Sequence, residues 1–136
     1  RNSLVLWGNG KAKREVIHVD DIANACLKVI ESSDELISGE IFNVGENEEN
    51  YTKIKIAELI QKYYPATSIE IQELKVDPRN YRVSFDKIKN NLGFSITKTV
   101  SDGIQEILDK INNQNLDPKQ SEFSNMCKMT EQVKAF

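Results

Sequence analysis

The chain has 136 residues, of which 39% are hydrophobic and 29% are charged, and its formal net charge at pH 7 is −3. This length allows one domain with a hydrophobic core, but it lies below the size usual for a complete cofactor-dependent enzyme. The acidic balance disfavours a nucleic-acid binder, and the sequence has neither an apolar run long enough to span a membrane nor the apolar core of a signal peptide, so we expect a cytoplasmic protein.

The first predicted elements are two strands that could pair as a hairpin. Leu4 to Trp7 forms a short apolar strand, and Gly8-Asn9-Gly10 ends it with residues that tolerate a positive φ. The second strand covers Val16 to Val19 and follows a basic run that contains Arg14. Because the chain starts without Met and directly inside an apolar strand, we expect an incomplete chain.

A helix from about Asp21 to about Ser33 should follow the second strand. Asp20 or Asp21 is the expected N-cap, because a carboxylate accepts hydrogen bonds from the unpaired N–H groups of the first turn. Its predicted buried face consists of apolar residues at helical spacing, namely Ile22, Ala25, Cys26, Val29 and Ile30. On this pattern Cys26 fills the core, and the lone His18 is a packed or hydrogen-bonded structural residue with no identifiable Ser or Cys partner.

A buried strand is predicted from Glu40 to Val44, where an almost continuous apolar run suits a strand covered on both faces. The loop from Glu46 to Asn50 is acidic and predicted to be solvated. It lacks the alternating ligand pattern of a calcium-binding loop, so no metal site is predicted.

The second half of the chain is predicted to contain three helices and one strand. Thr52 is the N-cap of a helix that Pro65 ends, and Ile69 to Ile71 is a half-exposed strand. The remaining signals are helix caps: Ser84 before a short helix that ends at Gly93, and a capping box of Thr99 with Asp102 before a helix that reaches Ile111.

The apolar pattern fades after Ile111, which divides the chain into a folded lobe, residues 1–111, and a tail, residues 112–136. In the tail Phe123, Met126 and Met129 are the expected apolar anchors. Their spacing allows either a short amphipathic helix or a frayed end.

Four blocks of sequence together resemble a known enzyme family. They are Trp7-Gly8-Asn9-Gly10, Arg14 to Asp21, Gly39 to Gly45, and Asp77 to Arg82 with the following Asp86-Lys87-Ile88 and Leu92-Gly93-Phe94. In this order they resemble the C-terminal, substrate-binding part of an NAD-dependent sugar-nucleotide epimerase/dehydratase, an extended short-chain dehydrogenase/reductase. The resemblance implies an α/β fold, a small mixed strand-helix lobe of a Rossmann-type enzyme that lacks the dinucleotide-binding half.

The resemblance also implies which residues bind the substrate, a nucleoside-diphosphate sugar. Arg14 aligns with an arginine that contacts the nucleotide-sugar, Arg79 with a later arginine that contacts its phosphate or nucleotide, and Arg82 is a third candidate. A guanidinium suits a diphosphate because it can hold two phosphate oxygens at once. Taken singly, each arginine could equally be a solvated side chain or one half of an ion pair.

Cofactor and catalytic motifs are not found in the sequence. No Gly-rich turn joins a strand to a helix, and the one tyrosine with a lysine four positions later, Tyr51 with Lys55, stands on the wrong helix for the family's catalytic pair. We therefore expect no catalytic residue and no bound NAD in this chain, although the complete enzyme would use NAD.

Two partners follow from this interpretation. One is the N-terminal cofactor domain, which the resemblance implies is missing, and the other is a second copy that pairs with the exposed edge of Glu40 to Val44. The alternative hypothesis is a free-standing, non-catalytic module that binds a nucleotide or a protein.

Overall fold

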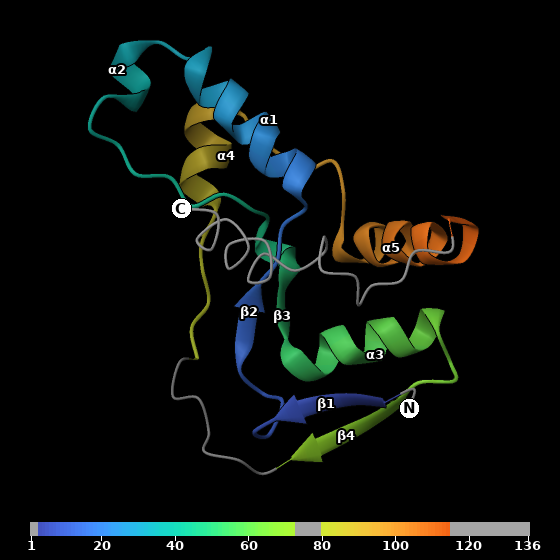
Figure 1. Cartoon of the computed structure of the whole chain (residues 1–136). Coiled ribbons are helices and arrows are strands. Elements are labelled where there is room, and N and C mark those ends of the chain that lie inside the picture. The colour runs from blue at the N-terminus through green and yellow to red at the C-terminus, as the bar shows by residue number, and fades with distance from the viewer. Residues whose placement is uncertain (1–2, 73–79, 115–136) are drawn as a thin grey trace, which may run out of the picture. The chain divides into compact units, whose positions relative to one another are not determined.

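The computed structural model describes residues 3–72 and 80–114 (Figure 1). The chain divides into two compact units, residues 1–104 and 105–136, and the fold described below is that of the first unit. The described elements are β1 (Ser3–Trp7), β2 (Lys13–Glu15), α1 (Val19–Ile30), α2 (Asp34–Ile37), the 3-10 helix η1 (Asn47–Glu49), β3 (Asn50–Thr52), α3 (Lys53–Tyr63), β4 (Ser68–Gln72), α4 (Asp86–Leu92) and α5 (Val100–Gln114).

β1 pairs in parallel with β4, a strand far along the chain. Leu4 lies opposite Ile69, and the N–H of Gly8 donates to the carbonyl of Gln72 at 2.9 Å beyond the last pair. α3 directly precedes β4 and contacts both strands. The predicted hairpin of the first two strands is therefore wrong, because β1 finds its hydrogen-bond partners in β4.

The predicted strand from Val16 to Val19 is also wrong. The strand in this region, β2, is shorter and earlier, and it pairs antiparallel with β3. α1 already begins at Val19, and its N-cap is His18 instead of Asp20 or Asp21. β-branched residues favour strands only where a neighbouring strand is available, and here the chain turns into a helix first.

The main core lies between α1, α4 and the loop after α4. Its buried side chains are Ala25, Phe85, Ile88, Leu92 and Phe94. Gly45 is required beside this core, because a Cβ atom there would lie 2.7 Å from the ring of Phe85. Cys26, predicted to fill the core, is instead exposed. Helical spacing predicts which residues share a face, but the width of the buried stripe depends on the packing partner.

The segment from Glu40 to Val44 is not a strand in the structure. Phe42 and Val44 pack against the core, whereas Ile41 is 83% exposed. Within the described ranges no strand pairs with this segment, which explains why an apolar run here lacks regular structure.

The predicted fold, a small mixed lobe without a dinucleotide-binding half, is contradicted by the strand topology. The structure is α/β. β1 and β4 form a parallel pair, and helix α3 contacts both of these strands. Parallel strands joined through a helix are the units from which Rossmann-type sheets are built. The predicted boundary after residue 111 stays a prediction, and most of the predicted tail lies outside the described residues.

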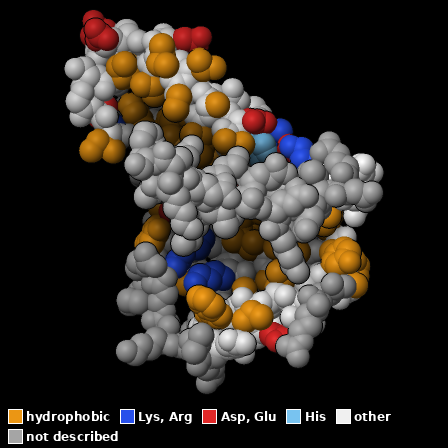
Figure 2. All heavy atoms as spheres, viewed as in Figure 1, with side chains coloured by type: hydrophobic (Ala, Val, Ile, Leu, Met, Phe, Trp, Pro, Cys, Tyr) orange, Lys and Arg blue, Asp and Glu red, His pale blue; other side chains and the backbone are white. Residues whose placement is uncertain are grey.

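An apolar groove of about 380 Å³ lies along α1 and the segment that follows α2. Its lining residues are Ile22, Ala25, Cys26, Val29, Ile30, Phe42 and Val44. Figure 2 shows hydrophobic side chains gathered over this end of the molecule. The face of α1 that was predicted to be buried is thus partly open to solvent.

Several predicted caps are confirmed. The hydroxyl of Thr52 accepts from the N–H of Lys55 at 3.3 Å, and Gly93 adopts a left-handed conformation with φ of 61° after α4. Thr99 and Asp102 form the capping box, since Asp102 accepts from the N–H of Thr99 at 2.8 Å and its own N–H donates to the threonine hydroxyl at 3.3 Å.

Candidate functional site

The predicted substrate-binding arginines fall on two neighbouring stretches of chain and on one segment that is not described. Arg14 lies in the middle of β2, opposite Tyr51 of β3. Arg82 lies in the segment from Asn80 to Asp86, which leads into α4. Arg79 lies outside the described residues, so its role stays a prediction.

Asparagine side chains hold the segment 80–86 against β2 and β3. The side chain of Asn50 donates to the carbonyl of Val83 at 3.0 Å and accepts from the N–H of the same residue at 3.1 Å. The N–H of Lys13 donates to the side-chain oxygen of Asn80 at 3.2 Å. Because a side-chain amide carries both a donor and an acceptor, it can pair with the backbone as a neighbouring strand would.

Tyr81 links this segment to both charged residues of β2. Its hydroxyl donates to Oε1 of Glu15 at 3.2 Å, and Cζ of Arg14 lies 5.9 Å from the centre of its ring. The other carboxylate oxygen of Glu15, Oε2, is buried and accepts no hydrogen bond in the described part of the chain.

A pocket of about 320 Å³ opens next to Arg82 in the same segment. Asn47, Val83, Ser84 and Asp86 complete its lining. The carboxylate of Asp86 accepts from the Ser84 hydroxyl and from the Asn47 amide, each at 2.7 Å. These two hydrogen bonds, followed by the charge of nearby cations including Arg82, lower the pKa of Asp86 below its usual value. The carboxylate oxygens are therefore engaged, and Arg82 supplies the pocket's positive charge.

The structure thus brings Arg14 and Arg82 into one neighbourhood. Tyr81, which lies against Arg14, is the residue directly before Arg82. Figure 2 shows Lys and Arg side chains exposed in the region of β2. Two guanidinium groups on adjoining stretches, one beside a pocket, form an arrangement that can bind an anion with several oxygens.

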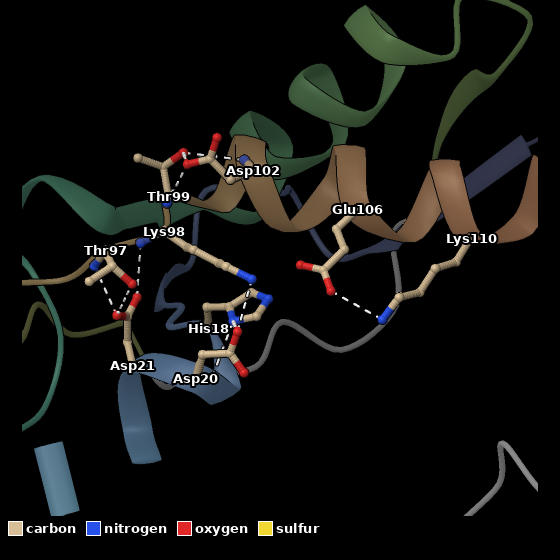
Figure 3. Close-up of polar contacts among 9 residues, drawn as sticks. All are labelled: His18, Asp20, Asp21, Thr97, Lys98, Thr99, Asp102, Glu106 and Lys110. Carbon is tan, nitrogen blue, oxygen red and sulfur yellow. Dashed lines mark hydrogen bonds and ion pairs between the residues drawn. The ribbon is translucent and has the colours of Figure 1, made fainter. Parts of the chain in front are cut away.

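The carboxylates at the start of α1 have a structural role (Figure 3). Asp21 is fully buried and accepts from the N–H and the hydroxyl of Thr97, at 2.8 and 2.7 Å, and from the N–H of Lys98 at 3.1 Å. Burial alone would raise the pKa of Asp21, but these hydrogen bonds outweigh it and the pKa is lowered. Asp20 pairs with the ammonium of Lys98 at 2.9 Å.

His18 is a structural residue, as the sequence predicts. Its Nδ1 accepts from the N–H of Asp20 at 3.2 Å, which caps the first turn of α1.

Glu49 and Tyr51 were not recognised as structural residues from the sequence. Glu49 is 7% exposed, and its carboxylate accepts from the Tyr51 hydroxyl at 3.1 Å and from the N–H of Val100 at 2.8 Å. The ammonium group of Lys55, four residues after Tyr51, pairs with the carboxylate of Glu58 at 3.3 Å. Tyr51 and Lys55 therefore interact with different partners, and the expectation that they are no catalytic pair stays a prediction.

Asn47, Asn50 and Tyr81 were also missed. The available signal was the recurrence of asparagine at positions 43, 47 and 50, directly around a predicted turn.

In the described ranges, no three His, Cys, Asp or Glu side chains come together as a metal site would require. No helix in those same ranges is long and apolar enough to cross a membrane.

Comparisons with known proteins relate this chain to one enzyme family. Residues 1–45 match the sequence profile of the NAD dependent epimerase/dehydratase family. GDP-L-fucose synthase 1 of Arabidopsis thaliana is 37% identical over 59 residues, which cover 43% of this chain and 17% of the plant enzyme. The chain is thus related to NAD-dependent epimerases and dehydratases, and it spans less than a fifth of this relative's length.

Solved structures show the same fold. UDP-glucuronic acid 4-epimerase from Bacillus cereus, in complex with UDP-glucuronic acid and NAD, superimposes with a TM-score of 0.68 at 22% identity over 82% of this chain and 36% of the epimerase. L-Threonine dehydrogenase from Phytophthora infestans gives a TM-score of 0.71 at 14% identity, over 83% of this chain and 38% of the dehydrogenase.

The position of the family match corrects the assignment made from sequence motifs. We predicted the C-terminal, substrate-binding part of such an enzyme, without its dinucleotide-binding half. The match instead lies in the first third of this chain and covers β1, β2 and α1. Together with the parallel β1–β4 pair, it supports a Rossmann-like α/β portion of an epimerase or dehydratase.

Proposed function

We propose that this chain carries part of the nucleotide-sugar-binding surface of an NAD-dependent epimerase or dehydratase. Arg14 and Arg82 contact the diphosphate of the substrate, and Arg79, outside the described residues, is a third contact. The observation that carries the proposal is the contact of Arg14 with Tyr81, the residue directly before Arg82, which itself lines a pocket of about 320 Å³.

The chemistry of a nucleoside diphosphate fits this arrangement. Its phosphate oxygens need several charge-assisted donors, and two guanidinium groups on adjoining stretches supply them without a metal ligand from the protein. The relation to epimerases and dehydratases, and the UDP-glucuronic acid in the Bacillus enzyme, support a nucleotide-sugar over other anions.

In the complete enzyme of this proposal, NAD would supply a hydride acceptor for the carbon that carries a sugar hydroxyl, the hydroxyl proton would pass to a base, and the hydride would later return to the sugar. The NAD in the Bacillus epimerase supports this cofactor. The expectation that this chain by itself binds no NAD and is catalytically silent stays a prediction, which a calorimetric titration with NAD tests. We also propose that the protein is cytoplasmic.

The experiment is a calorimetric titration of the chain with UDP and with GDP. Arg14→Ala and Arg82→Ala should each weaken binding by about tenfold or more, because a hydrogen bond to a charged group contributes roughly 1.5 to 3 kcal/mol. Lys28→Ala removes a positive charge from the exposed face of α1 and serves as the matched control. Unchanged affinity in both arginine variants would remove these residues from the site.

A further inference from the structure

We propose that Tyr81, held by Glu15, is the positioning residue that sets the affinity of Arg14 for a diphosphate. The inference rests on the proposed function and adds to it the way in which the binding site is preorganised. Tyr81 lies in the block Asp77 to Arg82, but the sequence gives it no role, and its connection to Arg14 becomes visible only through its contacts.

Tyr81 contacts both neighbours in β2 with different parts of its side chain. The ring faces the guanidinium of Arg14, with 5.9 Å between Cζ and the ring centre, which is within the range of a cation–π contact. The hydroxyl donates to Glu15 at 3.2 Å. The side chain is 45% exposed, so the ring lies at the surface that a ligand of Arg14 would approach.

The hydrogen bond to Glu15 has two consequences for Arg14. It fixes the direction of the ring, and it draws the phenol proton toward a negative charge, which makes the ring more electron-rich and a better partner for a cation. Oε2 of Glu15 is buried without a hydrogen bond from the described residues. Among the described residues, the hydrogen bond to this carboxylate therefore comes from the Tyr81 hydroxyl.

An arginine that rests on an aromatic ring is well prepared to bind a phosphate. A cation–π contact uses the flat face of the guanidinium and not its edge, where Nη1 of Arg14 donates to the carbonyl of Lys13 and where a phosphate would bind. It also restricts a long side chain before the ligand arrives, which reduces the conformational entropy lost on binding.

The alternative is that Tyr81 only fastens the segment 80–86 to β2. That segment already has other attachments, through Asn50 to Val83 and through Asn80 to Lys13. The two roles make different predictions, since a positioning residue acts only through Arg14, whereas a fastening residue affects the site whether or not Arg14 is present.

A double-mutant cycle separates the two roles. Tyr81→Phe removes the hydroxyl and keeps the ring, Tyr81→Leu removes the ring, and Glu15→Gln keeps an acceptor for the hydroxyl but removes the charge. Each is made in the parent chain and in Arg14→Ala, and binding of UDP is measured by calorimetry. The matched control is Tyr64→Phe, at a tyrosine that caps the C-terminus of α3 and is 43% exposed.

We expect Tyr81→Leu to weaken UDP binding by about tenfold and Tyr81→Phe and Glu15→Gln by about threefold, with no further loss from any of them in Arg14→Ala. Equal losses in both backgrounds would overturn the positioning role while Arg14 stays in the site. If Arg14→Ala leaves UDP binding unchanged in the parent chain, Arg14 is not in the site and the positioning role fails; if Arg82→Ala also leaves it unchanged, the proposed function fails as well. The conservative Tyr81→Phe variant keeps the test usable should Tyr81→Leu not fold.

Discussion

Asp21 and Glu49 show at the scale of single residues how buried polar groups join distant stretches of this chain. Asp21 connects α1 to the residues before α5 by accepting hydrogen bonds from Thr97 and Lys98. Tyr51 and Val100 share the carboxylate of Glu49. Both arrangements satisfy donors that would otherwise be costly to bury.

Asp21→Asn should destabilise the first unit by about 3 kcal/mol at pH 7, because the amide cannot accept all the donors that face the carboxylate. The lowered pKa of Asp21 means that its ionised form contributes stability above the unfolded pKa of about 4, and that this contribution is lost as the pH falls through the folded pKa. The difference in free energy of unfolding between parent and variant should thus shrink below about pH 4 in urea titrations.

Asp20→Asn is the control for this measurement. Asp20 pairs with Lys98 at the surface, where its side chain is 56% exposed, so the variant should lose less than about 1 kcal/mol. A loss at Asp20 as large as that at Asp21 would contradict the anchoring role of the buried carboxylate.

Tyr51 should ionise at a higher pH than an ordinary tyrosine. Burial raises its pKa most, and the charge and hydrogen bond of Glu49 raise it further. A raised folded pKa stabilises the fold below the unfolded pKa of about 10, and this stability is lost as the pH rises through the folded value. In a phenolate absorbance titration, Tyr51→Phe should remove the component that titrates last, and Glu49→Gln should shift it to lower pH. Loss of a component that titrates at or below the ordinary tyrosine pKa of about 10 in Tyr51→Phe would refute this.

The elements predicted best from the sequence are those defined by local signals. Thr52, Gly93 and the box of Thr99 with Asp102 were found because capping uses neighbouring residues. Strand partners were not found, since the pairing of β1 with β4 depends on residues far apart in the chain. An apolar run such as Glu40 to Val44 indicates burial without deciding whether the backbone finds a strand to pair with.

The candidate site was predictable only in part for the same reason. Arg14 and Arg82 came from motif resemblance, whereas Tyr81 and Asn50 act through contacts between β2, β3 and the segment 80–86. No local pattern shows that these stretches lie together.

Asn50→Ala tests whether the segment 80–86 depends on its asparagine contacts. Loss of both hydrogen bonds to Val83 should destabilise the first unit by about 2 kcal/mol and raise hydrogen exchange at the Val83 amide. Asn91→Ala, at an exposed position of α4, is the control and should leave Val83 protected. Unchanged exchange at Val83 in Asn50→Ala would show that other contacts hold the segment.

At the scale of the whole molecule, the apolar groove and the exposed Ile41 leave a sizeable hydrophobic surface open. Ile30, which lines the groove, is 76% exposed, and Ile41, next to the lining residue Phe42, is 83% exposed. Surfaces of this kind favour association with other chains. The predicted self-association through Glu40 to Val44 therefore stays a prediction even though the segment is not a strand.

Ile41→Lys should reduce self-association in sedimentation velocity runs over a concentration series, because a charge would have to be buried in the contact. Ile71→Lys, at a residue 53% exposed on β4, should leave it unchanged. A parent chain that sediments as a monomer at every concentration would contradict the prediction.

Whether Arg14 and Arg82 bind a nucleoside diphosphate is decided by an NMR titration of the chain with UDP. The side-chain Nε–H signals of both arginines and the backbone amides of Asn80 to Asp86 should shift together and saturate with one affinity. Shifts confined to residues outside β2 and this segment, or none at millimolar UDP, would contradict the claim.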